Sequence, residues 1–560
     1  MSQIVLADVS RPRSFSHWPW KTLSYVIAAV VVIPILVIFT QWATVGFGEQ
    51  EIWQHLFDTK LGRLLLNTLI LLIGVGFGVA LLGVSLAWLT SVCDFPGRKI
   101  FEWALMLPLA IPAYVMAFVF LGTMNYAGPV QTAFRGWFGR DVYFPDMQGS
   151  GAVILVLSLV LYPYVYMLAR SAFVTQGRTM MDAGRILGQN YWQAFYKLAV
   201  PIARPAIVAG LALALMETLA DFGAVSIFNY DTFTTAIYSA WYGLFNLAVA
   251  AQLASLLLLF VAVLLVMEKR GRNKARYTQH NSQAMQLYKL KGWQALASTL
   301  FCSLVLLLAF ILPLCQLLIW CFEIAAQELD RRYYGFLLNT LGLGLIAAVT
   351  TTIFALLLAY VKRLPAGAVE KRWQSLAIQV STLGYALPGS VLAVGIILTF
   401  TYIDNSVMSV VQSIFADNPR PILVGSLFAL VLAYSTRFMA VAFAPVEAGF
   451  ERINPKVIEA AKSLGATPGR LLHQIYVPLL KPGLITALII VFVDVMKEMP
   501  ATLIMRPFGW DTLAVRIYQM TAEGQWERAA LPSVTLILLG LIPVILLIRN
   551  SRPALPRALS

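Results

Sequence analysis

The sequence has few charged residues for its length. Lys, Arg, Asp and Glu make up 12% of its 560 residues, hydrophobic residues make up 59%, and the mean hydropathy is +0.76. A soluble protein of this size could not cover its surface with so few charges. The composition therefore excludes a soluble globular protein and predicts a polytopic membrane protein.

Cysteine and histidine are also scarce, with four of each. The cysteines form no CxxC pair and the histidines show no metal-ligand spacing, which argues against a disulfide framework or a resident metal centre. No G-x-x-x-x-G-K-[ST] stretch and no Ser/His/Asp set is visible. We therefore expect no ATP hydrolysis by a P-loop mechanism within this chain, no bound cofactor and no enzymatic activity.

Long apolar runs, by contrast, are abundant. A helix that crosses a bilayer needs roughly 20 apolar residues, and alternating β-barrel patterning is absent. We predict twelve membrane-spanning helices, near residues 23–43, 64–90, 102–122, 151–169, 203–227, 244–266, 295–322, 336–361, 375–402, 421–445, 479–505 and 530–548.

The net charge of +14 does not indicate nucleic-acid binding, because the basic residues gather in alternate loops. They include the N-terminus, the 268–292 segment and the C-terminus, as expected for loops on the cytoplasmic side. The first apolar run, 23–43, is followed by no small-x-small cleavage site, so we interpret it as a span. The pattern predicts a membrane protein with both termini in the cytoplasm.

The chain contains an internal repeat. Gly188 and Gly465 are 277 positions apart, and so are Pro201 and Pro478. Further matches at similar offsets are LLNTL at 65–69 and 337–341, Pro112 and Pro388, Pro205 and Pro482, and Ile-Tyr at 237–238 and 517–518. The small drift in offset indicates short insertions between two copies of one module.

The repeat predicts the domain organisation. Residues 1–267 form a first six-helix module, 268–292 a basic cytoplasmic linker, and 293–560 a second six-helix module. An even number of spans per module gives both copies the same orientation, related by a pseudo-two-fold axis along the membrane normal. The predicted fold is thus an all-α polytopic membrane protein of two tandem modules, with a transport pathway at their interface.

A matching loop lies between the fourth and fifth spans of each module, at 182–201 and 459–478. In the second copy, Asn454 can cap a helix and Pro455 suits its first turn. Gly465 permits a sharp bend, and Pro478 begins the next membrane helix. We predict a pair of short helices at the cytoplasmic face. A membrane-surface loop without a partner is the alternative.

The loops resemble the EAA signature of binding-protein-dependent (type I) ATP-binding-cassette importer permeases, E-A-A-x-x-x-G followed by nine residues and I-x-L-P. The second copy matches except for Val477 in place of Leu. The first copy departs with Asp for Glu and Gly for Ala, which predicts weaker or asymmetric docking. The matching positions are Glu459, Ala460, Ala461, Gly465 and Pro478 in the second copy, and Asp182, Ala183, Gly184, Gly188 and Pro201 in the first.

This resemblance covers the whole chain and implies its partners. In the family the loops couple the permease to a separate cytoplasmic ATPase homodimer, which binds ATP and Mg, and a periplasmic binding protein delivers the cargo. The resemblance thus implies a transport subunit embedded in the lipid bilayer, with no nucleic acid among its partners.

Two acid pairs follow the loops. The members of each pair are four residues apart, which places them on one helix face. Carboxylates in a membrane are costly and usually face a cavity or a partner, so we predict an electronegative pathway that suits a hard cation or an organic polycation. Structural pairing with Lys497 or Arg437, or exposure to periplasmic water, is the alternative. The pairs are Glu217 with Asp221 and Asp494 with Glu498.

Two stretches of the sequence resemble importer permeases with a particular cargo. KEMPATLIMRPFGWDTLAVRIY at 497–518 and YPYVYMLARSAF at 162–173 are similar to ferric-iron importer permeases, as is the fused two-module layout. The resemblance implies import of ferric iron across a bacterial inner membrane by alternating access, with transient Fe³⁺ at Asp221 and Glu498. Thiamine, polyamine and phosphonate importers are close relatives and stay open as alternatives, and so does a more distant one, an ion-coupled secondary transporter.

Overall fold

The computed structural model describes residues 18–44, 50–139, 144, 147–186, 193, 195–272, 287–364, 367–415 and 421–551. Within these residues, eleven helices are long and apolar enough to cross a membrane, and each overlaps one of the first eleven predicted spans. Two predicted spans are not continuous: 102–122 is interrupted between Ala104 and Ala113, and 375–402 between Ser381 and Gly389. A shorter apolar helix, Ala530–Pro543, lies at the position of the twelfth predicted span. The all-α polytopic fold predicted from the sequence is confirmed.

The first half contains the following elements in chain order, with η marking 3₁₀ or π-helical segments. They are α1 (Trp18–Thr44), α2 (Gln50–Leu56), η1 (Phe57–Leu61), α3 (Gly62–Val92), β1 (Cys93–Asp94), α4 (Arg98–Ala104), η2 (Leu107–Ala110), α5 (Ala113–Met124), α6 (Pro129–Phe138), α7 (Ser150–Ile186), η3 (Phe195–Ala199), α9 (Val200–Ala220), α10 (Gly223–Ile227), α11 (Phe233–Tyr238), η4 (Ser239–Gly243) and α12 (Leu247–Arg272).

The second half follows the same order. Its elements are β2 (Tyr288–Lys289), α13 (Trp293–Leu306), η5 (Leu307–Ile311), α14 (Leu312–Glu328), α15 (Arg331–Val361), α16 (Ala368–Ser381), η6 (Leu383–Ala386), α17 (Gly389–Phe415), α18 (Leu427–Glu451), α19 (Pro455–Ser463), α20 (Pro468–Arg470), η7 (Leu471–Tyr476), α21 (Val477–Lys497), α22 (Pro500–Met505), α23 (Leu513–Ala522) and α24 (Ala530–Ser551).

The sequence repeat reappears in the helix bounds. Helices α7 and α18 begin 277 residues apart, and the same offset separates the starts of α9 and α21 and of α10 and α22. The starts of α11 and α23 differ by 280, the offset of the Ile-Tyr pair. From α7 and α18 onward, the two copies therefore share the long helices and the two short helices that follow α9 and α21.

The chain packs as two compact units that cut across the halves of the sequence. One comprises Met1–Ile33, Ile346–Tyr385 and Tyr434–Phe492, and the other Pro34–Leu345, Ala386–Ala433 and Val493–Ser560. In the smaller unit, a Cβ on Gly483 of α21 would lie 2.8 Å from the carbonyl oxygen of Pro445 in α18. Glycine thus lets α21 lie directly against the backbone of α18.

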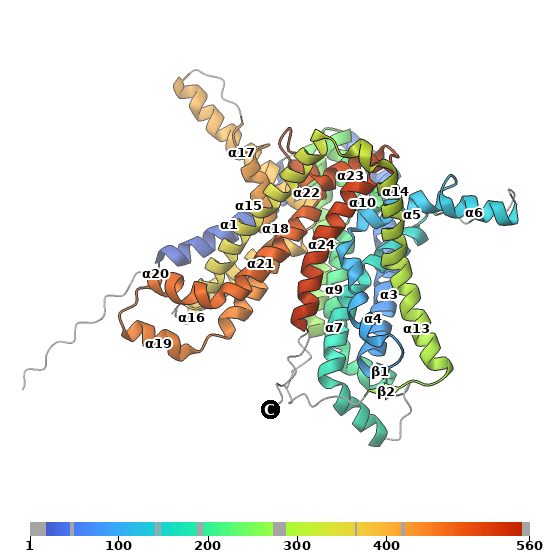
Figure 1. The fold of residues 1–560 in the computed structure, drawn as a ribbon. Helices are drawn as coiled ribbons and strands as arrows, with labels where there is room; N and C mark the ends of the chain where they lie inside the picture. The colour runs from blue at the N-terminus through green and yellow to red at the C-terminus, as the bar shows by residue number, and fades with distance from the viewer. Residues whose placement is uncertain are drawn as a thin grey trace, which may run out of the picture. The chain divides into compact units, whose positions relative to one another are not determined.

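Helices α3, α7 and α9 lie side by side in the larger unit (Figure 1). Glycine again sets their separation, because a Cβ on Gly210 of α9 would lie 2.7 Å from the Cα of Val165 in α7. Buried hydroxyls of α7 tie down the preceding segment: Tyr162 Oη donates to Leu105 O at 2.8 Å and Tyr166 Oη to Glu102 O at 2.9 Å. Such pairing is required where no water is available.

The first helix of the chain packs partly against the second half. In the smaller unit, Lys21 of α1 forms an ion pair with Glu370 of α16, with Nζ and Oε1 2.6 Å apart. The neighbouring Trp20 packs edge-on against Tyr360 of α15, with ring centroids 5.7 Å apart. The start of α1 is thus held by residues from the other copy.

The first helices of the second half pack reciprocally against the first half, within the larger unit. Thr299 Oγ1 of α13 donates to Pro96 O at 3.1 Å, and Trp320 of α14 stacks on Phe118 of α5 with centroids 6.4 Å apart. Strand β2, which lies within the predicted linker 268–292, pairs in parallel with β1. The two halves therefore exchange their leading helices.

Candidate functional site

The second EAA-type loop has the helix start predicted for it. Asn454 Oδ1 accepts a hydrogen bond from the Lys456 N–H at 3.0 Å, and Pro455 occupies the first turn of α19. After α19, Gly465 adopts a φ of +81°, the left-handed region in which a side chain is unfavourable. The chain then turns through α20 and η7 into α21 at Val477. The cap and the glycine together define a short helix followed by a bend.

Part of this loop is an exposed surface. Glu459 and Ala460 are exposed while Ala461 is buried, so α19 has one inward and one outward face. Leu464 follows the helix and is 89% exposed, although it is apolar. Gly465 has no heavy atom within 4 Å of an added Cβ. An exposed leucine beside open space is suited to contact another protein surface.

The helix that carries the first EAA-type loop is continuous where its counterpart is broken. Asp182, Ala183 and Gly184 lie in the last turns of α7, which continues without a break to Ile186. Gly188 lies outside the described residues. Pro201 follows the first residue of α9, just as Pro478 follows the first residue of α21. Among the described residues, the copies therefore agree at the three EAA positions, which are helical in both, and where the next membrane helix begins. They differ in the break that precedes α19.

Two of the predicted acids cap short helices. Helix α9 ends at Ala220 and α21 at Lys497, so Asp221 and Glu498 lie just beyond the helical face on which the spacing placed them. Asp221 Oδ1 accepts from Val225 N at 3.1 Å, and Glu498 Oε1 accepts from Ala501 N at 3.2 Å. Each carboxylate thereby satisfies a free N–H at the start of α10 or α22.

The other two acids lie within the long helices, Glu217 in α9 and Asp494 in α21, and both are half-buried. Lys497 Nζ donates to Leu109 O at 3.0 Å, and Arg437 is buried in α18. Among the described residues, no three His, Cys, Asp or Glu side chains lie close enough to hold a metal ion. The pathway role of the four acids stays a prediction.

The repeated LLNTL motif positions the loops after the long helices, a role that sequence reasoning missed. Asn67 Nδ2 donates to Asp231 O at 2.9 Å, and Asn339 Nδ2 donates to Asp511 O at 3.1 Å. The recurrence of the motif at both sites was the available signal. We call the two segments that these asparagines hold the first short-helix segment, 221–243, and the second short-helix segment, 498–522.

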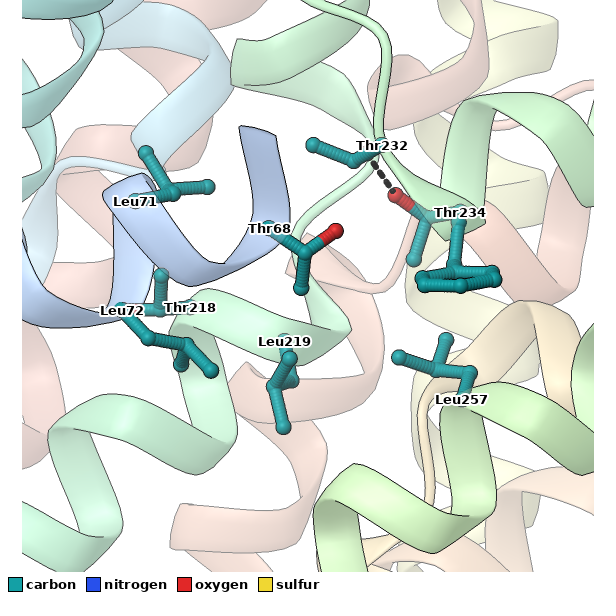
Figure 2. A pocket seen from close by; sticks show the side chains of 9 residues that line it. Thr68, Leu71, Leu72, Thr218, Leu219, Thr232, Thr234 and Leu257 are labelled. Atoms are coloured by element: carbon teal, nitrogen blue, oxygen red, sulfur yellow. Dashed lines mark hydrogen bonds between the residues drawn. The ribbon is translucent and has the colours of Figure 1, made fainter. Parts of the chain in front are cut away.

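The threonine of the same motif differs between the copies. Thr340 Oγ1 accepts from Leu513 N at 2.8 Å, whereas the Thr68 hydroxyl is buried without a partner among the described residues. Figure 2 shows Thr68 beside a small cavity, across from the 3.0 Å hydrogen bond between the Thr232 and Thr234 hydroxyls. The cavity is lined by Thr68, Leu71, Leu72, Thr218, Leu219, Thr232, Phe233, Thr234 and Leu257.

The two short-helix segments bring repeat-related tyrosines together. Phe222, which is buried, packs against Tyr238 of α11 and Tyr518 of α23, with ring centroids 4.9 and 5.4 Å apart. Tyr242 packs on Tyr238 at 4.8 Å. The Oη of Tyr518 lies 3.1 Å from Ser226 Oγ. Tyr238 and Tyr518 are half-buried and Tyr242 is exposed, so this tyrosine cluster is packed yet accessible.

Burial dominates the electrostatics of the tyrosine cluster. Burial, followed by the neighbouring Tyr518 and Tyr242, raises the pKa of Tyr238 to about 12, while Arg506 opposes the shift. Burial also raises the pKa of Tyr242, and Arg506 again opposes it. The guanidinium is held by an ion pair between its Nε and Asp511 Oδ1 at 2.8 Å. Because burial outweighs this positive charge, the protonated phenol forms of Tyr238 and Tyr242 are favoured.

Comparison with known proteins identifies the same family for both modules. The family described as "Binding-protein-dependent transport system inner membrane component" matches residues 79–268 and again 364–557. Both EAA-type loops and both short-helix segments lie within these matches.

Similar proteins extend over most of the chain. The Fe(3+)-transport system permease protein FbpB 2 of Haemophilus influenzae is 26% identical over 539 residues, covering 94% of this chain and 97% of that protein. The ferric transport system permease protein FbpB of Actinobacillus pleuropneumoniae is 23% identical, covering 89% and 73%. The molybdenum transport system permease protein ModB of Escherichia coli is 32% identical over 29% of this chain and 70% of its own length. The chain therefore belongs to the binding-protein-dependent inner-membrane transport components, the type I ABC importer permeases, and carries two fused copies of their module.

Proposed function

We propose that this chain is the permease subunit of an ATP-driven importer of ferric iron. The observation that carries the proposal is the near full-length similarity to an Fe(3+)-transport permease, which spans 94% of this chain and 97% of the relative. The molybdenum permease aligns with 29% of the chain and a sulfate permease with 39%. Only the ferric relatives among these share the fused two-module length.

The energy source in this proposal is a separate ATPase homodimer that docks on the two EAA-type loops, 182–201 and 459–478. The exposed Leu464 beside the bend at Gly465 gives the second loop an apolar contact surface. ATP and Mg bind to the partner, and this chain contributes no ATPase site. The departures from the motif at Asp182 and Gly184, and the unbroken helix that precedes the first loop, support asymmetric docking.

Transport proceeds by alternating access. Each loop leads through a π-helical segment into α9 or α21, so a displacement of the loop is passed directly to the following helix. Each of these 21-residue helices is roughly 30 Å long at 1.5 Å per residue, about the thickness of the bilayer core. The short-helix segments at their far ends then face the periplasm, where a binding protein delivers iron, and both chain termini are cytoplasmic.

Reconstitution tests the proposal. Proteoliposomes that contain the full chain, its ATPase and its binding protein should accumulate radioactive ferric iron only when ATP and the binding protein are both present. An ATPase variant that binds but does not hydrolyse ATP is the control. ATP-dependent uptake of thiamine, a polyamine or a phosphonate in place of iron would reassign the cargo. Uptake by the chain alone, driven by an ion gradient, would show a secondary transporter instead.

A further inference from the structure

We propose that α6 is an interfacial anchor, a helix whose apolar face lies in the surface of the lipid bilayer beside the outer end of α5. The occupant of this face is lipid, at the boundary between the headgroups and the acyl chains. The inference goes beyond the proposed import of iron and does not depend on the cargo.

The sequence of α6 makes the helix amphipathic. In PVQTAFRGWF, the apolar side chains follow the spacing i, i+3, i+4, i+7, i+8, which places them on one face of an α-helix. Trp137 is 81% exposed and Phe138 is 62% exposed, so the largest side chains of this face are open rather than packed inside the larger unit. The apolar face consists of Val130, Ala133, Phe134, Trp137 and Phe138.

The polar side of α6 holds the helix in a fixed orientation. Gln131 Nε2 donates to Met124 O at 2.8 Å, and Arg135 Nη2 donates to Tyr126 O. The Arg135 guanidinium also lies over the Tyr126 ring, with Cζ 3.7 Å from the ring centroid. Both acceptors lie at the end of α5 or in the turn after it. The polar side chains therefore point back toward α5, and the apolar face is directed away from it.

The turn before α6 changes the direction of the chain. A Cβ on Gly128 would lie 2.4 Å from the carbonyl oxygen of Thr123, so glycine is needed where the chain folds back on the end of α5. Pro129 then begins the new helix. Figure 1 shows α6 extending outward from α5, across the direction of α3 and α7. Because α3 and α7 are membrane-spanning helices, α6 runs along the membrane surface.

Three features favour lipid over a soluble protein as the occupant. Helix α5 ends at Met124 and α6 begins at Pro129, so the apolar face is continuous with a membrane-spanning segment. Its most exposed side chain is Trp137, a residue type enriched at the level of the headgroups. Arg135 is the one charged residue in the sequence of α6, and its contact with Tyr126 leaves the apolar face without the charge complementarity that guides a soluble partner. An amphipathic helix of this kind lies in the plane of the interface.

The position of the anchor gives it a role in the larger unit. Phe120, near the end of α5, packs on Phe228 of the first short-helix segment, with ring centroids 6.1 Å apart. The anchor is therefore attached to the end of α5 that supports this segment. Lipid contact at α6 would hold that end of α5 at a constant depth in the membrane. The assignment to the periplasmic leaflet rests on the proposed orientation of the chain, whereas the lipid contact itself does not.

The test is site-specific photocrosslinking of the full chain with its ATPase, in nanodiscs of phosphatidylethanolamine and phosphatidylglycerol. Benzoylphenylalanine replaces Trp137 on the apolar face or, as the matched control, Thr132, which is also exposed but lies on the opposite side of the same helix. After illumination, mass spectrometry should detect phospholipid adducts at position 137 with at least about tenfold higher yield than at position 132. Phe138→benzoylphenylalanine serves as the test position where the variant at 137 does not assemble.

Repeating the experiment with the binding protein present distinguishes the other occupants. Phospholipid adducts at position 137 in its presence and in its absence support the anchor. Adducts with the binding protein or with a second copy of the chain in place of lipid would overturn the proposal. Equal lipid labelling at positions 132 and 137, or no adduct at either, would overturn it as well. Iron uptake is not a readout here, so a failure of the anchor leaves the importer assignment untouched.

Discussion

The two copies of the EAA-type loop begin from helices that match in register and differ in continuity. Helix α7 spans Ser150–Ile186, and adding the repeat offset of 277 gives 427–463, the span from the start of α18 to the end of α19. In the second copy that span is broken between Glu451 and Pro455. The residues equivalent to Asn454 and Pro455 are Gly177 and Arg178 in the first copy. The break in the second copy thus coincides with Asn454 and Pro455, which the first copy lacks.

The physical reason is local. Proline has no N–H to donate and its ring clashes with the preceding turn, so it kinks or breaks a helix. Pro163 in α7 and Pro445 in α18 are accommodated inside helices, whereas Pro455 occupies the first turn of a new one. Asn454 then satisfies the new helix start with its side chain. Neither constraint exists at Gly177 and Arg178, and the helix continues. Asymmetry between the loops is therefore built into the backbone as well as into the motif residues.

The largest expected effect comes from introducing the helix break of the second copy into α7 of the first copy. Arg178→Pro should interrupt α7 at a cost of about 3 kcal/mol to the local helix and give the first loop the form of the second. A pair of spin labels on either side of position 178 should report a broader, shifted distance distribution. Arg178→Ala is the control and should leave it unchanged. An unaltered distribution in the proline variant would show that the sequence difference is not what separates the two loops.

The threonines of the two LLNTL motifs, Thr68 and Thr340, allow a second comparison of the copies within the larger unit. Thr340→Val should destabilise the protein by about 1–3 kcal/mol because it leaves the buried Leu513 N–H without its acceptor. Thr68→Val should leave stability nearly unchanged, since the Thr68 hydroxyl has no partner in the described part of the chain. Thermal unfolding of both variants in the same detergent measures the difference. Equal losses would mean that Thr68 is also engaged.

The bend of the second loop can be tested with two glycines that are both exposed. Gly465→Val places a side chain in the left-handed region, at a cost of about 1–2 kcal/mol, which lowers the population of the bent form by roughly 5- to 30-fold. We expect iron uptake to fall while the ATPase remains active. Gly469→Ala meets no neighbouring atom and no positive φ, so it should behave as the wild type. Full coupling in Gly465→Val would contradict the role of the bend.

The smallest expected effect separates capping from cation binding at the acids. Asp221→Ala and Glu498→Ala should each cost about 1 kcal/mol of stability through loss of a helix cap. Asp221→Asn and Glu498→Gln keep an oxygen acceptor and should preserve stability. The rate of iron uptake then distinguishes the two roles. A slower rate in the amide variants supports the predicted cation pathway, and an unchanged rate leaves the acids as caps alone.

Much of the fold was predictable from the sequence, because a bilayer admits few solutions. Apolar runs of span length must be helices, and the repeat is visible in the spacing of Gly465, Pro478 and their counterparts alone. The start of α19 was likewise readable from Asn454 and Pro455. These features depend on residue types and spacings that the chain carries locally.

The remaining features depend on contacts between distant residues. The Ile-Tyr repeat was visible, but spacing alone does not place Tyr238 and Tyr518 on the same phenylalanine. The acids at 221 and 498 were assigned to a helix face because nothing in the spacing shows that α9 and α21 end one residue earlier. Periodicity predicts faces within a helix, whereas tertiary packing decides where the helix stops.

The exchange of leading helices has a consequence for biosynthesis. Lys21 is made about 350 residues before its partner Glu370. At roughly 5–20 residues per second, the start of α1 is therefore in the membrane for tens of seconds before the ribosome supplies the protein surface that receives it. During that interval lipid must solvate its apolar side chains, and the first module matures only when translation of the second is well under way.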